Sequence, residues 1–290
     1  MKPEDIDPKV YELYDEYCHS TMPRRVFLER AAALAVGGTV MAQALLPRYA
    51  EAAEVSFTDP RIKALYVDYD SPGGTSGRMR GYLVQPAGQG PFPAVVVIHE
   101  NRGLNPYIED VARRFATEGF VALAPDGLSP VGGYPGNDDD GRTLQAGLDR
   151  GKLMTDLLNS ARFLKAHALS TGKLGATGFC FGGGVANFLA VEMGGDLQAS
   201  APFYGAAPAA EDVQRIEAEM LIHYAEEDPR INAMRPDYEA ALKANDVAYE
   251  MHVYPGTRHG FHNDSTPRYD AEAAKLAWSR TVDLFKRRLA

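Results

Sequence analysis

Three continuous apolar runs constrain the fold of this 290-residue chain more than any other feature. They are PAVVVIHE at residues 93–100, FVALAPDG at 120–127 and KLGATGFC at 173–180. Short runs without polar alternation are typical of strands that are buried on both faces. Helical patterns at residues 108–119 and 152–167 separate them. This alternation predicts an α/β fold with a mostly parallel central sheet and helices on both faces.

Further elements flank this core. Residues 62–70 and 79–87 border the turn-forming stretch SPGGTSG, which predicts an antiparallel hairpin at the edge of the sheet. Residues 128–141 contain several glycines and prolines and three consecutive aspartates, and we expect a loop there. More strands and helices follow to the end of the chain, so residues 53–290 are predicted to form a single domain.

Residues 1–52 form a separate N-terminal extension. Its twin arginines Arg24 and Arg25 precede a moderately apolar run over residues 31–46, and the small-residue pattern Ala50-Glu51-Ala52 follows. This order is typical of a Tat-type signal and predicts export to the periplasm. The run is short and broken by glycine, so we expect no stable membrane span. The alternative is a surface helix of a cytoplasmic protein, since apolar residues in the run also recur at helical spacing.

The formal net charge of −9 argues against nucleic acid as a partner. Only two cysteines occur, Cys18 and Cys180, and they are far apart in the sequence. They form no CxxC pair, so the sequence gives no indication of a zinc site or a disulfide framework.

The second cysteine lies in an unusual setting. Gly178-Phe179-Cys180-Phe181-Gly182 ends a predicted strand and begins a predicted helix. The form G-x-nucleophile-x-G in this context places a nucleophile on a sharp strand-to-helix turn, where bulkier neighbours would clash. The helix N-terminus favours the thiolate, and the N–H of Phe181 lies where an oxyanion would develop. The alternative is a small buried cysteine in a glycine-rich bend.

Two later strand ends supply partners for a cysteine nucleophile. Asp228 follows one strand and His259 follows the last, which gives the order nucleophile, acid, histidine. His259 would serve as base and acid, and Asp228 would hold its tautomer. Glu226 and Glu227 are rival acids. His262 is a rival histidine that could also form a zinc pair with His259, although further ligands are lacking.

At this point the sequence resembles the dienelactone hydrolase family, the carboxymethylenebutenolidases of the α/β-hydrolase superfamily. The resemblance begins near Thr58 and rests on VVVIHENRG, FVALAPDG, GKLGATGFCFGGG and YPGTRHGFH. It implies an α/β-hydrolase fold with Cys180, Asp228 and His259 as a triad. It also implies that Glu100 interacts with the thiol until substrate redirects it, and that the N–H of Asn101 is the second oxyanion donor. A buried acidic residue at a strand end is costly unless paired, which agrees with such a role or with a pair to Arg102.

One position departs from that pattern. The family holds a substrate carboxylate with arginines, one of them four residues after the catalytic histidine, and here that residue is Asn263. Arg102 and Arg142 are the candidate substrate-binding residues, and Arg258 and Arg268 are further substitutes.

The sequence therefore predicts a cysteine-dependent hydrolase that cleaves an ester or lactone through an acyl-enzyme, and an anionic substrate is one of the expected classes. We expect no metal or organic cofactor, and a monomer or homodimer. The alternatives are a thioesterase or peptidase on the same triad, a non-catalytic binding protein of this fold, and a thiol redox sensor. The sensor would need Cys18 as a resolving cysteine.

Overall fold

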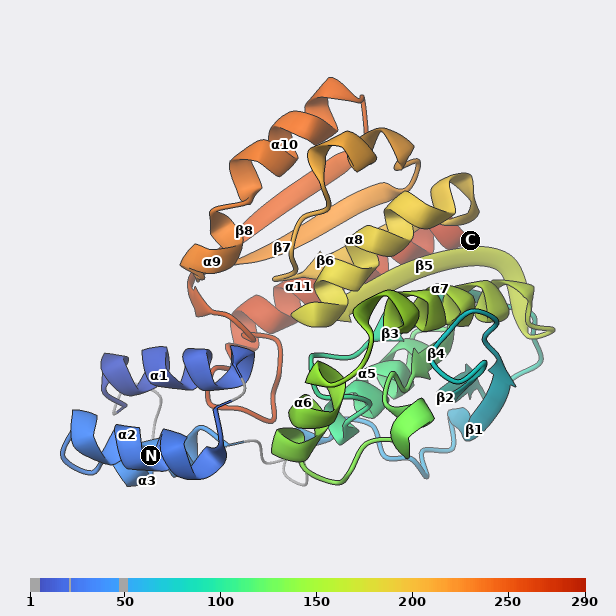
Figure 1. The fold of residues 1–290 in the computed structure, drawn as a ribbon. Coiled ribbons are helices and arrows are strands. Elements are labelled where there is room, and N and C mark those ends of the chain that lie inside the picture. Colours follow the sequence, from blue (N-terminus) through green and yellow to red (C-terminus); the bar gives the residue numbers. More distant parts are fainter. Residues whose placement is uncertain (1–5, 21, 47–51) are drawn as a thin grey trace.

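The computed structural model describes residues 6–20, 22–46 and 52–290 of the chain (Figure 1). Within these residues, eight strands form one sheet in the order β1-β2-β4-β3-β5-β6-β7-β8. The strands are β1 (Ile62–Asp70), β2 (Arg78–Pro86), β3 (Phe92–Ile98), β4 (Val121–Pro125), β5 (Ser170–Phe179), β6 (Ala199–Phe203), β7 (Glu219–Glu227) and β8 (Tyr249–Arg258). β1 and β2 pair antiparallel, β2 also pairs antiparallel with β4, and the strands from β4 to β8 are parallel. The predicted sheet and its edge hairpin are confirmed.

Helices cover both faces of this sheet. The helices of the domain are α5 (Pro106–Thr117), α6 (Asp138–Ala146), α7 (Arg150–Ala166), α8 (Phe181–Met193), α9 (Pro229–Asn232), α10 (Arg235–Ala244) and α11 (Ala271–Leu289). Apolar side chains of α7, α8 and α10 pack in one core cluster, and those of α5 and α11 pack in another. Along β3, Val96 belongs to the first cluster, whereas Val95 and Val97 belong to the second. Burial on both faces explains why this strand lacks polar alternation.

The loop expected over residues 128–141 is shorter than predicted. After a 3₁₀ turn at Ser129–Val131, helix α6 already begins at Asp138. The Asn137 side chain caps it by accepting from the N–H of Asp140 at 2.9 Å. Acidic side chains are favourable in the first turn of a helix, where the dipole is positive. The three aspartates are therefore a helix start rather than a loop, and the prediction was wrong at this point.

The N-terminal extension folds as three helices, α1 (Pro8–His19), α2 (Arg24–Leu34) and α3 (Gly38–Ala44). Figure 1 shows them as a separate group beside the domain, on the side where α9 follows β7. Arg24 and Arg25 begin α2, and the apolar run is divided between α2 and α3 by Gly37 at φ +79°. The proposed cleavage motif includes residues 50 and 51, which lie outside the described residues. Export through a Tat-type signal stays a prediction.

Candidate active site

Cys180 stands at the turn between β5 and α8, in a backbone conformation with φ +56°. A side chain is rarely found in this left-handed region because its Cβ crowds the backbone. The neighbouring glycines make the turn possible. A Cβ on Gly178 would lie 2.2 Å from the carbonyl oxygen of Gly182, and one on Gly182 would lie 2.3 Å from that of Ile98. The strained turn expected from the sequence is therefore present.

The two glycines that follow differ from each other. A Cβ on Gly183 would lie 2.4 Å from the carbonyl oxygen of Phe203, so α8 packs directly on β6 there. A Cβ on Gly184 would meet nothing closer than 3.5 Å, an ordinary contact. The close approach of α8 to β6 therefore requires glycine at position 183 but not at position 184.

The structure brings Cys180, His259 and Asp228 together. His259 Nδ1 lies 2.5 Å from Asp228 Oδ2, and the Cys180 thiol lies near enough to the imidazole to raise its pKa. Asp228 caps α9, where its other oxygen accepts from the N–H of Ile231 at 3.3 Å. All three side chains are buried. Burial opposes the charged imidazole, but Cys180 and Asp228 outweigh it and raise the pKa of His259.

The rival residues have other partners. Glu226 accepts from the N–H of Gly256 at 2.7 Å, and Glu227 pairs with Arg258 at 2.9 Å. His262 Nδ1 lies 2.7 Å from the hydroxyl of Tyr107. In the part of the chain that the structure describes, no three His, Cys, Asp or Glu side chains gather as a metal site would require.

Glu100 follows β3 and is almost fully buried, with 1% of its surface exposed. Its Oε2 accepts from Asn263 Nδ2 at 3.1 Å and lies 3.8 Å from Arg102 Nε. Burial raises the pKa of Glu100, Arg102 lowers it, and the nearby Cys180 raises it again, with a net increase. Asn263, the position that departs from the family pattern, therefore contacts the carboxylate that the resemblance placed beside the thiol.

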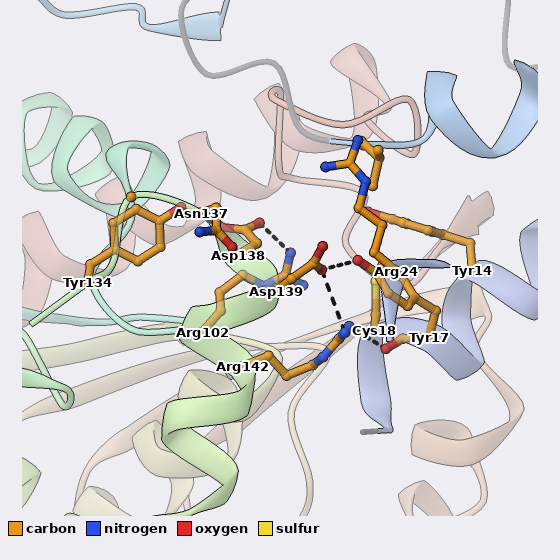
Figure 2. A pocket seen from close by; sticks show the side chains of 12 residues that line it. Tyr14, Tyr17, Cys18, Arg24, Arg102, Tyr134, Asn137, Asp138, Asp139 and Arg142 are labelled. Carbon is orange, nitrogen blue, oxygen red and sulfur yellow. Dashed lines mark hydrogen bonds and ion pairs between the residues drawn. The ribbon is translucent and has the colours of Figure 1, made fainter. Parts of the chain in front are cut away.

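The two candidate substrate arginines are already engaged. Arg102 Nη1 pairs with Asp138 at 2.8 Å. Arg142 donates to the carbonyl oxygens of Tyr17 and Met22, the second at 3.0 Å, and its guanidinium lies 4.1 Å from the Tyr17 ring centroid. Figure 2 shows these groups around a cavity of about 180 Å³ between the N-terminal helices and α6.

Two features of the site, Tyr204 and the cover by helix α1, were missed in the sequence. Tyr204, at φ +37° after β6, packs its ring 4.9 Å from that of His259. Its buried hydroxyl has no hydrogen-bond partner among the described residues. Arg268, named from the sequence as a substitute arginine, is buried against the Tyr14 ring. Helix α1 lies over the site, and the Asn101 side chain donates to the Cys18 carbonyl oxygen at 2.7 Å. Only Tyr204 had a usable signal, because it follows a strand at the functional edge of the sheet.

Comparison with known proteins decides the family. The model of the dienelactone hydrolase family matches residues 79–289. The chain belongs to the dienelactone hydrolase family. Members of this family have the α/β-hydrolase fold, and the chain is accordingly a hydrolase that acts on carboxylic esters or lactones. A second model, described as YqhI-like, matches residues 1–36.

Several relatives of this dienelactone hydrolase family member are similar over most of their length. A Saccharolobus solfataricus protein named as a carboxymethylenebutenolidase is 34% identical, over 76% of this chain and 96% of its own. YghX of Escherichia coli strain K12, named as a hydrolase fragment, is 67% identical, over 36% of this chain and 90% of its own. A crystal structure named as a dienelactone hydrolase from Klebsiella pneumoniae is 26% identical with a TM-score of 0.67, covering 78% of this chain and 99% of that one. Among the described residues, no helix is long and apolar enough to cross a membrane.

Proposed function

We propose that this hydrolase uses Cys180 as its nucleophile and cleaves an ester or lactone through an acyl-enzyme. The observation that carries the proposal is the grouping of Cys180, His259 and Asp228 at the carboxyl edge of the sheet, with His259 bonded to Asp228. In this arrangement of side chains, a proton that leaves the Cys180 thiol passes to the His259 imidazole. The Asp228 carboxylate then stabilises the resulting imidazolium. The raised pKa of His259 favours this charged pair.

The reaction would begin with attack of the Cys180 sulfur on the substrate carbonyl carbon. The N–H of Phe181, at the start of α8, and the N–H of Asn101 would then donate to the oxyanion. Collapse of this intermediate breaks the ester C–O bond and leaves a thioester on Cys180. In a lactone the leaving oxygen stays on the acyl group and takes its proton from His259. Water, deprotonated by His259, finally attacks the thioester, releases the acid and restores the thiol.

Glu100 would act on the thiol before attack. The carboxylate is buried close to Cys180, and its raised pKa makes it able to hold a proton there. We propose that Glu100 exchanges a proton with Cys180 and is then held away from the sulfur by Asn263 and Arg102, its present partners.

Arg142 is the better of the two proposed substrate-binding residues. Asp138 and Glu100 both lie beside the Arg102 guanidinium and neutralise its charge. Arg142 has one carboxylate neighbour, Asp139 at 3.6 Å, and otherwise donates to uncharged carbonyl groups. An anionic substrate could replace those carbonyls and form the stronger, charge-assisted bonds.

Hydrolysis of a dienelactone and of p-nitrophenyl acetate by the wild type, Cys180→Ala and Cys180→Ser would test this function. We expect lactone hydrolysis that Cys180→Ala reduces by at least roughly 10³-fold. Thioester and peptide substrates, assayed in parallel, test the thioesterase and peptidase alternatives. Activity on the acetate alone would keep the nucleophile but reject the lactone as substrate. Activity that survives Cys180→Ala would overturn the mechanism, and no activity together with an inert thiol would favour a binding protein.

A further inference from the structure

The N-terminal helices have a core of their own. The apolar side chains buried among α1, α2 and α3 form one cluster drawn entirely from residues 6–46. At its centre Tyr17 stacks on Phe27 with 4.5 Å between ring centroids, and Tyr14 lies 5.8 Å from Phe27. Since the segment buries its apolar residues internally, its fold does not depend on an apolar interface with the domain.

The contacts between these helices and the domain are of a different kind. Arg258 lies 4.4 Å from the Tyr11 ring centroid, and Arg268 lies 4.9 Å from that of Tyr14. Asp15 forms an ion pair with Arg268 at 3.6 Å. The Tyr17 hydroxyl donates to Asp139. Polar contacts of this kind are typical of interfaces that open, whereas permanent interfaces are mostly apolar.

The same contacts occupy groups that the proposed reaction needs. The carbonyl oxygens of Tyr17 and Met22 hold Arg142, the proposed substrate arginine. The Cys18 carbonyl oxygen accepts from the side chain of Asn101, whose backbone N–H is a proposed oxyanion donor. These acceptors gather near the C-terminal end of α1, where the helix dipole is negative. The end of α1 thus lies where an anionic substrate group would bind.

Helix α1 also borders the routes to the proposed nucleophile. A cavity of about 190 Å³ reaches His259 and Asp228, and α1 contributes Tyr11 and Asp15 to its wall. A second cavity of about 320 Å³ reaches Phe181 and Asn101, and Ser20, directly after α1, lies in its wall. Cys180 itself is 8% exposed. A substrate that approaches from either side therefore meets α1.

We propose that residues 6–46 form an autoinhibitory lid, which occupies the substrate site through the carbonyl end of α1 and must move before an anionic substrate reaches Cys180. The inference rests on the proposed function of that site. The lid and the substrate compete for Arg142. The apparent dissociation constant of the substrate is therefore its intrinsic value divided by the fraction of molecules that are open.

The full-length variant carrying both Tyr17→Phe and Asp15→Asn tests this lid. It removes the hydroxyl contact with Asp139 and the charge beside Arg268 but keeps the ring of residue 17 in the lid core. The control is Glu29→Gln, because Glu29 is exposed and pairs with Arg25 inside the segment. Three rates are measured in each protein: alkylation of the Cys180 peptide by iodoacetamide, ester hydrolysis, and amide hydrogen exchange of α1.

In the double variant we expect Cys180 alkylation about tenfold faster, a lower KM with kcat little changed, and faster exchange in α1. The control should match the wild type. Unchanged or slower alkylation would show that α1 is a fixed wall, and unchanged exchange would show that these contacts do not hold the lid. If alkylation rises but neither protein hydrolyses any ester, the lid stands and the proposed function fails.

Discussion

At the scale of single residues, Glu100 is the most informative side chain of the site. Its carboxyl group is buried beside a thiol and has one amide and one guanidinium as close partners. Full ionisation in such surroundings is costly, which is why burial raises its pKa. A group with this property keeps its proton to a higher pH than an exposed glutamate does, which suits a proposed partner of the thiol.

Replacing Glu100 by Gln keeps the size and shape of the side chain but removes its ionisable carboxyl group. We expect kcat/KM to fall by roughly 10²-fold or more, because the thiol loses the carboxyl group that assists its deprotonation. The folded wild type binds a proton to Glu100 more tightly than the unfolded chain does. Its unfolding free energy should therefore fall as pH rises from the unfolded pKa near 4.5 through the folded pKa. Denaturant unfolding across this range should show a steeper decline in the wild type than in E100Q, and equal declines would contradict this account of its pKa.

The folded state favours the charged form of His259, whereas it favours the neutral form of Glu100. The raised pKa of His259 expresses this preference for the imidazolium. Stability from this group is fully present below the unfolded pKa near 6.5 and is lost as pH rises through the folded pKa. Asp228→Asn should lower that folded pKa and reduce kcat by as much as about 10⁴-fold. The pH dependence of Cys180 alkylation measures the shift, and an unaltered profile would remove Asp228 from the proposed triad.

At the scale of elements, the turn between β5 and α8 was predictable and the start of α6 was not. Glycine is required where backbones approach closely, so the pattern around Cys180 already specified a strained turn after a strand. Consecutive aspartates suit both a loop and the first turn of a helix, and here the cap by Asn137 marks a helix start. Sequence periodicity carries no information on such a cap.

Two nearby glycines, Gly182 and Gly184, provide a matched test of that turn. Gly182→Ala would place a Cβ 2.3 Å from a backbone carbonyl oxygen, and we expect a loss of about 1–3 kcal/mol in unfolding free energy. Gly184→Ala meets only ordinary contacts, and alanine's helix propensity should leave stability unchanged or raise it by up to ~1 kcal/mol. Thermal unfolding of both variants decides the point. Equal effects would mean that the turn relaxes freely around position 182.

At the scale of the whole molecule, the chain combines a catalytic domain with a small helical unit that covers its functional edge. The domain was predictable because its buried strands have a local pattern. The contacts of the extension join residues as distant as Tyr17 and Arg142, and no spacing or periodicity reports such a pairing. A signal segment and a lid are compatible, since cleavage after residue 52 would remove the whole lid.

Limited proteolysis can measure how separable the two parts are. Because the segment has its own core and mostly polar contacts with the domain, we expect cuts within residues 6–46 well before cuts in the sheet. Higher salt should speed these early cuts by weakening the Asp15–Arg268 pair. Simultaneous cleavage of both parts, independent of salt, would indicate one cooperative unit.

The central claim, that Cys180 carries the acyl group, is tested most directly by trapping that group. The protein would be mixed with p-nitrophenyl acetate, quenched in acid within the first turnover and mapped by peptide mass spectrometry. We predict one acetyl group on the peptide that contains Cys180, and none in Cys180→Ala. An acetyl group on another residue, or turnover without any acyl-enzyme, would contradict the account.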